Sequence, residues 1–263
     1  MTVSSLQIRT LERLNETGGV FYTAADALAA VNLAQRIFAF LTLCLEVQRQ
    51  FQLTPGNQWY ALQRTFADMI LVLRCEWRNQ PTAANDAIIG DPTFGGAMFN
   101  DQQVTTATAA TPKLQPGTLH QFAAADNGWY GSTGMPARYN SVGFGLLIFD
   151  LQPDDQYTAL ITYARMPVAL VNAADVPEIP EPDHNCLIDF AVGFLRIREG
   201  GQELQNEAPS LQSFLTAVKK RAAQVRMRSL AQRYDHAPPE IEMPDLSRML
   251  KTRPDLVPNR RSA

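Results

Sequence analysis

The most constraining feature of this chain is an extended, proline-rich stretch that turns abruptly into an amphipathic helix. Pro177, Pro180 and Pro182 keep the approach extended, because each proline fixes its own φ and disfavours a helical conformation before it. From Asp183 onward, apolar residues recur at the spacing of a helix with one buried face. These residues are Leu187, Phe190, Ala191, Phe194 and Leu195. We expect the Gly-Gly pair at 200–201 to end the helix, so the chain here returns to a helical core after an excursion.

Length and composition are those of one large domain or of a core with one inserted subdomain. Of the 263 residues, 46% are hydrophobic, which is ample for a packed interior. The net charge of −3 gives the molecule as a whole no nucleic-acid-binding footprint. The longest apolar run, Ile37–Val47, is too short for a membrane span, and the first residues lack the order of a signal peptide. We therefore expect a soluble protein with no membrane partner.

Residues that carry chemistry are sparse. Three widely spaced cysteines form neither a disulfide framework nor a zinc-binding pattern, and we expect them to be buried thiols. They are Cys44, Cys75 and Cys186. His184 has acidic neighbours but no second histidine at helical spacing, so a first-turn structural residue is the favoured interpretation and an enzyme centred on His184 the alternative. We expect no catalytic residue, no metal and no cofactor.

Four amphipathic segments predict a helical core built from two pairs of helices. They lie near residues 5–15, 23–51, 183–199 and 209–234, with Pro209 in the first turn of the last helix. Thr23 and Asp26 form a capping box at the start of the second helix, which is apolar on several faces and therefore central. Neither pair can bury its apolar residues alone, so the two pairs should pack together.

Between the two pairs, turn residues separate short aromatic and β-branched runs, which predicts a β-rich insertion. Strands are expected at 59–62, 69–77, 138–141, 144–150 and 157–165, the last three as an antiparallel meander. A helix is the alternative for 69–77, and residues 82–116 are expected to form a surface loop with at most one short strand. The predicted fold class is α+β: a bundle of about four helices with an inserted antiparallel β subdomain and an extended C-terminal tail. The predicted segments are 1–56 and 175–234 for the core, 57–174 for the insertion and 235–263 for the tail.

The fourth predicted helix is basic. It contains no acidic residue from Pro209 to Tyr234, and a spacing of seven places several of its cations on one face. Three interpretations stay open: a solvated face, a contact with an acidic surface of a neighbouring subunit, and a conduit that contacts nucleic-acid phosphates. The residues assigned to a channel or ring interface are Lys219, Lys220, Arg226, Arg228 and Arg233.

The proline-rich tail carries more apolar residues than a simple linker needs. Such a segment can become ordered along a partner, although a disordered end with incidental apolar residues explains the pattern equally well. The residues assigned to partner docking are Ile241, Met243, Leu246, Met249, Leu250 and Leu256.

A hypothesis of another class makes the β insertion a binding module that recognises carbohydrate or a protein partner. Its exposed anchors would be Trp129, Tyr130, Tyr139 and Tyr163. Burial of these rings in the core of the insertion would argue against it.

Several stretches, in the same order along the chain, resemble the head-to-tail adaptor (connector or neck) proteins of tailed bacteriophages. They are YTAADALAAVNLAQRIFAFLTLCLE at 22–46, the run from Trp129 to Tyr139, the block 175–203 and VRMRSLAQRYDHAPPEI at 225–241. The resemblance covers most of the chain and is least clear over 82–116.

This resemblance implies a non-enzymatic structural virion protein in the neck between capsid and tail, assembled in the host cytoplasm. It implies a homo-oligomeric ring, usually of twelve subunits, that docks on the portal protein through its C-terminal segment. The ring would extend the channel through which double-stranded DNA passes during genome ejection, without sequence specificity. It would also offer a surface to a tail or nozzle protein.

Overall fold

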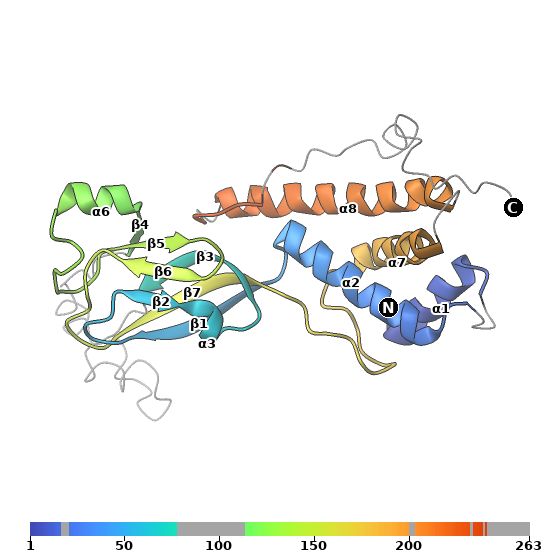
Figure 1. Cartoon of the computed structure of the whole chain (residues 1–263), viewed down its shortest axis with the longest axis horizontal. Helices are drawn as coiled ribbons and strands as arrows, with labels where there is room; N and C mark the ends of the chain where they lie inside the picture. Colours follow the sequence, from blue (N-terminus) through green and yellow to red (C-terminus); the bar gives the residue numbers. More distant parts are fainter. Residues whose placement is uncertain (17–20, 78–113, 200–202, 232–233, 239, 241–263) are drawn as a thin grey trace, which may run out of the picture. The chain divides into compact units, whose positions relative to one another are not determined.

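The computed structural model describes residues 1–16, 21–77, 114–199, 203–231, 234–238 and 240. The chain divides into two compact units, a helical unit from residues 1–46 and 164–263 and a β unit from residues 47–163. For comparison, the sequence predicted an insertion over 57–174. Helices and largely antiparallel sheets occur together, which confirms the α+β fold class (Figure 1).

Four α-helices and one short 3-10 helix form the described part of the helical unit. They are α1 (Val3–Arg13), α2 (Ala24–Thr42), η3 (Glu181–Asp183), α7 (His184–Glu199) and α8 (Glu203–Ala231). The predicted capping box is present at the start of α2: the Thr23 hydroxyl accepts a hydrogen bond from the Asp26 N–H, and the Asp26 carboxylate accepts one from the Thr23 N–H.

Two helix boundaries correct the sequence prediction. The second helix ends at Thr42, because Leu43 adopts a left-handed conformation with φ 51° that a continuing helix does not permit. The following residues form strand β1 (Glu46–Leu53) rather than two further turns of helix. The fourth helix begins at Glu203, so Pro209 lies inside it and not in its first turn.

The interior of the helical unit confirms that helices distant in the sequence pack together. One apolar cluster joins residues of α1, α2 and α7 with Leu170, and a second joins residues of α2, α7 and α8 with Ile179. In the second cluster, the rings of Phe38 and Phe190 lie 6.2 and 4.8 Å from the ring of Phe214. Among the described helices, α2 alone has the length and hydropathy of a membrane span, but eight of its residues are buried in this core.

Two sheets build the β unit, which also contains the short helices α3 (Leu62–Thr65) and α6 (Leu119–Ala125). One sheet has the strand order β1–β7–β3 and the other β2–β6–β5–β4. The remaining strands are β2 (Trp59–Ala61), β3 (Met69–Trp77), β4 (Gln115–Pro116), β5 (Arg138–Val142), β6 (Leu146–Phe149) and β7 (Tyr157–Arg165). Of the predicted surface loop over 82–116, all but the last three residues lie outside the described residues.

The predicted three-stranded meander is only partly correct. Strands β5 and β6 pair antiparallel, but β7 lies between β1 and β3 in the other sheet instead of next to β6. The reason lies in the connection from β6 to β7: the Gln152 N–H donates to Ser132, and the Pro153 carbonyl accepts from the Gly56 N–H. These bonds fix the connection to loops on either side of it and lead the chain into the second sheet.

Candidate assembly interface

Helix α8 has two faces. Its buried face packs in the helical core, at the three- and four-residue spacing of an amphipathic helix. These buried residues are Phe214, Val218, Ala222, Val225 and Ser229. Between Pro209 and Ala231 the helix has basic residues but no acidic residue. Its other face is therefore positively charged, and it also carries exposed apolar side chains.

The arginines of α8 form ion pairs within the helical unit. Both Arg221 Nε and Nη2 lie close to Asp183 Oδ2, at 2.7 and 2.6 Å, and both side chains are largely buried. Arg228 lies 3.2 Å from Glu46, a carboxylate that is only 11% exposed. These contacts hold α8 against Asp183, just before α7, and against Glu46, at the start of β1. Arg221 and Arg228 therefore have a structural role.

The remaining residues assigned to a channel or ring interface are in different situations. Arg226 lies 3.5 Å from Glu240, whose side chain is 80% exposed. Lys219 and Lys220 are exposed and form no ion pair with any other residue that the structure describes. Arg233 lies outside the described residues, as do all six apolar tail residues assigned to partner docking. Within the described chain, the two lysines are therefore the cations of α8 that remain for an external contact.

A second, exposed stripe runs along α8 opposite its buried face. Thr216, Lys220, Ala223, Met227 and Leu230 recur at alternating spacings of four and three and are all exposed. Met227 and Leu230 are 69% and 64% exposed, although both are large apolar side chains. We refer to Ala223, Met227 and Leu230 as the α8 stripe. The sequence analysis did not identify it, although apolar residues outside the buried spacing were the available signal.

A segment between β7 and α7 also exposes apolar side chains. Val168, Val171 and Val176 are 66%, 72% and 54% exposed, and we call residues 168–176 the valine loop. Asn32 of α2 holds this loop with a reciprocal pair of hydrogen bonds: its amide donates to the Leu170 carbonyl at 3.0 Å and accepts from the Leu170 N–H at 2.9 Å. Because Asn32 reproduces the bonding of a paired strand, the loop is held by the helix without regular secondary structure.

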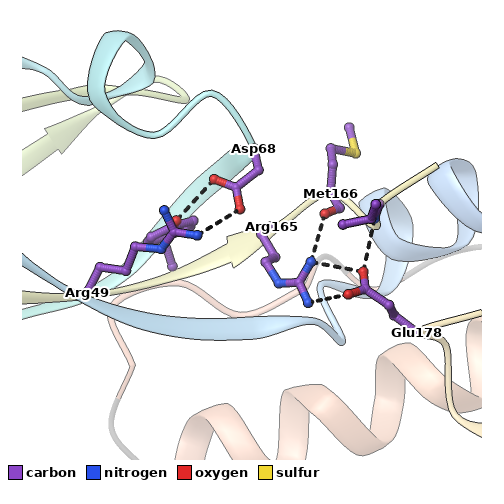
Figure 2. Close-up of polar contacts among 7 residues, drawn as sticks. Arg49, Asp68, Arg165, Met166 and Glu178 are labelled. Carbon is purple, nitrogen blue, oxygen red and sulfur yellow. Dashed lines mark hydrogen bonds and ion pairs between the residues drawn. The ribbon is translucent and has the colours of Figure 1, made fainter.

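Two carboxylates complete the support of the valine loop. Glu178 forms a bidentate pair with Arg165, at 2.9 and 2.8 Å, and accepts a hydrogen bond from the Val168 N–H (Figure 2). Asp175 accepts hydrogen bonds from the N–H groups of Val171 and Asn172. The pKa of Glu178 is lowered, first by Arg165, and the pKa of Asp175 is lowered by these two backbone donors.

His184 is a buried structural residue. Its side chain is 1% exposed, Nε2 lies 2.8 Å from the Ile179 carbonyl, and Nδ1 lies 3.1 Å from the Met1 amino group. Nearby, burial is the main cause that raises the pKa of the Cys186 thiol to about 12, so this cysteine is not an activated nucleophile. The described residues contain no group of three or more side chains that could hold a metal ion.

The aromatic anchors proposed for the β unit separate into two kinds. Tyr139 and Tyr163, expected to be exposed, are 1% and 0% exposed, so this part of the hypothesis is wrong. Each ring belongs to the core of the β unit, and each hydroxyl has a partner there: Tyr139 accepts from the Cys75 N–H, and Tyr163 donates to Asp68. Asp68 also pairs with Arg49 at 3.7 Å (Figure 2).

The other two anchors lie in a chain of ring contacts on the surface of the β unit. Tyr130 is 61% exposed and lies 6.0 Å from the 37% exposed ring of Trp59. Trp129 is half-buried between Tyr130 and Phe122, at 5.8 and 5.6 Å. This cluster offers aromatic surface to a partner, and Trp59 is a member of it that the sequence analysis did not assign.

Comparison with known proteins assigns the chain to a family. No curated protein matches the sequence of the chain. The sequence model of the SU10 adaptor protein family matches residues 1–238, which include both halves of the helical core and the whole β unit. Because the match spans most of the sequence, the chain belongs to the SU10 adaptor protein family, an adaptor-type family of phage virion components.

Proposed function

We propose that this protein is the head-to-tail adaptor of a tailed phage, which forms a ring under the portal protein, extends the DNA channel and docks the tail. The observation that carries the proposal is the family match over residues 1–238. Membership of an adaptor family already implies interaction with other phage structural proteins.

Two surfaces of the helical unit support a role in assembly. The α8 stripe and the valine loop each expose large apolar side chains, which cost free energy in water and are typical of surfaces that a partner covers. Lys219 and Lys220 add positive charge without an acidic partner among the described residues. A passing DNA duplex would meet such lysines through its phosphates, without sequence readout.

The proposal includes no catalytic role. His184, the best candidate in the sequence, is buried and has polar neighbours at both ring nitrogens. The expected consequence is that a His184→Gln variant changes the stability of the helical unit but removes no chemical activity from the particle.

Electron microscopy of the purified protein mixed with its cognate portal protein tests the proposed function directly. The expected result is an additional ring on one face of the portal, with a central opening continuous with the portal channel. A variant that ends at Tyr234 should keep its folded helical core but lose attachment to the portal. Portals that stay bare in the presence of the full-length protein, or full attachment by the truncated protein, would contradict the proposal.

The aromatic cluster of the β unit supports a second candidate function, recognition of carbohydrate or of a protein partner. Exposed aromatic rings provide large contact areas at a low entropic cost, and both Tyr130 and Trp59 supply such surface. A Tyr130→Ala variant should lose binding to that partner, and Phe144→Ala, at another exposed ring of the same unit, should keep it. Equal binding by both variants on a glycan array and to purified tail proteins would leave this candidate without support.

A further inference from the structure

We propose that the valine loop of one subunit packs on the α8 stripe of the next subunit, and that this contact is the repeating interface of the ring. The inference rests on the proposed function, because it names the surfaces through which copies of this chain would meet. Its occupant is a second copy of the same chain, and the contact is head-to-tail, since two different surfaces take part.

The two surfaces differ in charge. From Met166 to Asp183 the chain carries four acidic residues, Asp175, Glu178, Glu181 and Asp183, and no basic residue, whereas α8 is basic and free of acidic residues from Pro209 to Ala231. Part of this charge is neutralised within the subunit, since Arg165 pairs with Glu178 and Arg221 of α8 pairs with Asp183. Glu181 lies 3.7 Å from the Met1 amino group, but its side chain is 82% exposed, so it can still face a neighbouring molecule, as can the two exposed lysines of α8. Opposite charges would then flank an apolar contact, which favours this pairing over contacts between like surfaces.

The two surfaces also suit each other in shape and order. The valine loop is irregular, yet its backbone is bonded at many points, including Ser4 N–H to the Ala173 carbonyl at 3.0 Å and Val3 N–H to the Asp175 carbonyl at 2.8 Å. A loop already held in one conformation loses little entropy when it binds. On α8, the small Ala223 precedes the two larger side chains of the stripe, so protruding valines can approach the helix closely at that point.

The two surfaces lie on different sides of the helical unit. Leu170 of the valine loop packs in the apolar cluster that contains α1, and α8 packs in the other cluster. The loop emerges on the side of α2 away from α8, where it is drawn as the gold trace below α2 (Figure 1). Surfaces on opposite sides of a subunit can repeat from copy to copy, and such a contact closes into a ring when the rotation between copies permits it.

Cysteine crosslinking on the portal tests this interface. The double variant Val171→Cys/Met227→Cys, in the full-length protein and assembled with its portal, should give a ladder of multimers with a thiol-specific crosslinker. An equal mixture of the two single variants should give dimers and no longer products, because each subunit then has only one reactive surface. Burial raises the pKa of the native Cys44 thiol and slows its reaction, and the parent protein measures the background that remains.

The matched control is Ile8→Cys/Met227→Cys, which places the second thiol at another exposed apolar residue of the helical unit. It should give no ladder. Charge reversal of both lysines, Lys219→Glu/Lys220→Glu, should raise the protein concentration needed for rings by about two- to tenfold at low salt. The same reversal at Arg226 alone should have a smaller effect, because Glu240 already faces that arginine.

The possible outcomes separate this interface from the proposed function. Rings that form on the portal without a ladder from the double variant would overturn the interface and leave the adaptor function in place. Dimers from Met227→Cys alone would indicate a twofold contact between α8 stripes and would also overturn it. A crosslink within one chain of a Met227→Cys/Leu246→Cys variant would assign the stripe to the chain's own C-terminal segment. Absence of rings with the wild-type protein would overturn both.

Discussion

The helical unit and the β unit fill their interiors in different ways. The helical unit combines helices from both ends of the sequence, and its two apolar clusters consist mainly of aliphatic residues with a few phenylalanines. The β unit comes from one continuous segment, and the apolar cluster formed by its described residues is rich in aromatic rings, such as Phe149 between Tyr60 and Trp77. Distant segments must be fixed in register by polar contacts such as Asn32 with Leu170, whereas stacked rings fix the β unit mainly through packing.

The largest expected effects come from removing one ring from each unit. Phe214→Ala and Phe149→Ala each delete a side chain that is at most 1% exposed. Each should lower the free energy of unfolding of its own unit by about 3–5 kcal/mol, through lost burial and the cavity left behind. Thermal unfolding followed by a helical signal and by a near-ultraviolet aromatic signal would measure the two units separately.

The matched control for these variants is a ring that each unit exposes. Phe21→Ala and Phe144→Ala remove rings that are 78% and 59% exposed and should change stability by at most about 0.5 kcal/mol. If Phe149→Ala destabilised the helical signal as much as the aromatic signal, the two units would unfold as one body. The helical unit and the β unit would then differ in how they are built but would not unfold independently.

The next effect concerns the polar fixation of the valine loop. Asn32→Ala removes both hydrogen bonds to Leu170 and leaves the polar backbone groups of a 5% exposed residue without that partner. We expect a loss of about 1–3 kcal/mol in the stability of the helical unit and faster amide exchange at Leu170. Asn185→Ala, at an exposed position of α7, is the control and should leave both unchanged. Unchanged exchange at Leu170 in the Asn32 variant would show that other contacts alone hold the loop.

Particular residues show how far the sequence could predict this fold. The helical core was predictable because its apolar residues follow helical spacing, and because the capping box of Thr23 and Asp26 marks the start of α2. The end of α2 was not predictable, because Leu43 adopts a left-handed backbone conformation and no glycine or proline in the sequence indicates it. The available signal for β1 was the alternation of Gln48, Gln50 and Gln52 with residues that, apart from Arg49, are apolar.

Placement of β7 and recognition of the assembly surfaces depend on tertiary contacts that no local pattern encodes. β7 alternates as a strand should, but the sequence does not state which sheet receives it. Likewise, the sequence shows the basic residues of α8 only as a group, and the structure separates Arg221 and Arg228, which are paired, from Lys219 and Lys220. The exposed face of the valine loop could not be predicted from the sequence, because an irregular segment has no periodicity that indicates which side chains are exposed.

A smaller effect is expected at the start of α2. Thr23→Ala removes the hydroxyl that accepts from the Asp26 N–H and should cost the helical unit about 1 kcal/mol. Thr23→Ser keeps a hydroxyl at the cap and should retain most of that stability. Urea unfolding of the two variants compares them directly. Equal losses in both would assign the effect to the lost methyl group instead of the cap.

The smallest effect is a response to acid that should appear in the helical unit and centre on the valine loop. Glu178 and Asp175 have pKa values below their ordinary values of 4.5 and 3.8, because ionised Glu178 is bound by Arg165 and Asp175 by backbone N–H groups. In this range the unfolded chain binds more protons than the folded one, so the stability contributed by both groups is present above these values and is lost as pH falls through the lowered ones. Amide exchange at Val168 and Val171 should therefore accelerate in acid before the β unit responds. Glu178→Gln and Asp175→Asn should weaken this pH dependence, and Glu12→Gln, at an exposed position of α1, should not. An acid response that began in the β unit would contradict this contrast, in which polar contacts hold the helical unit and packed rings hold the β unit.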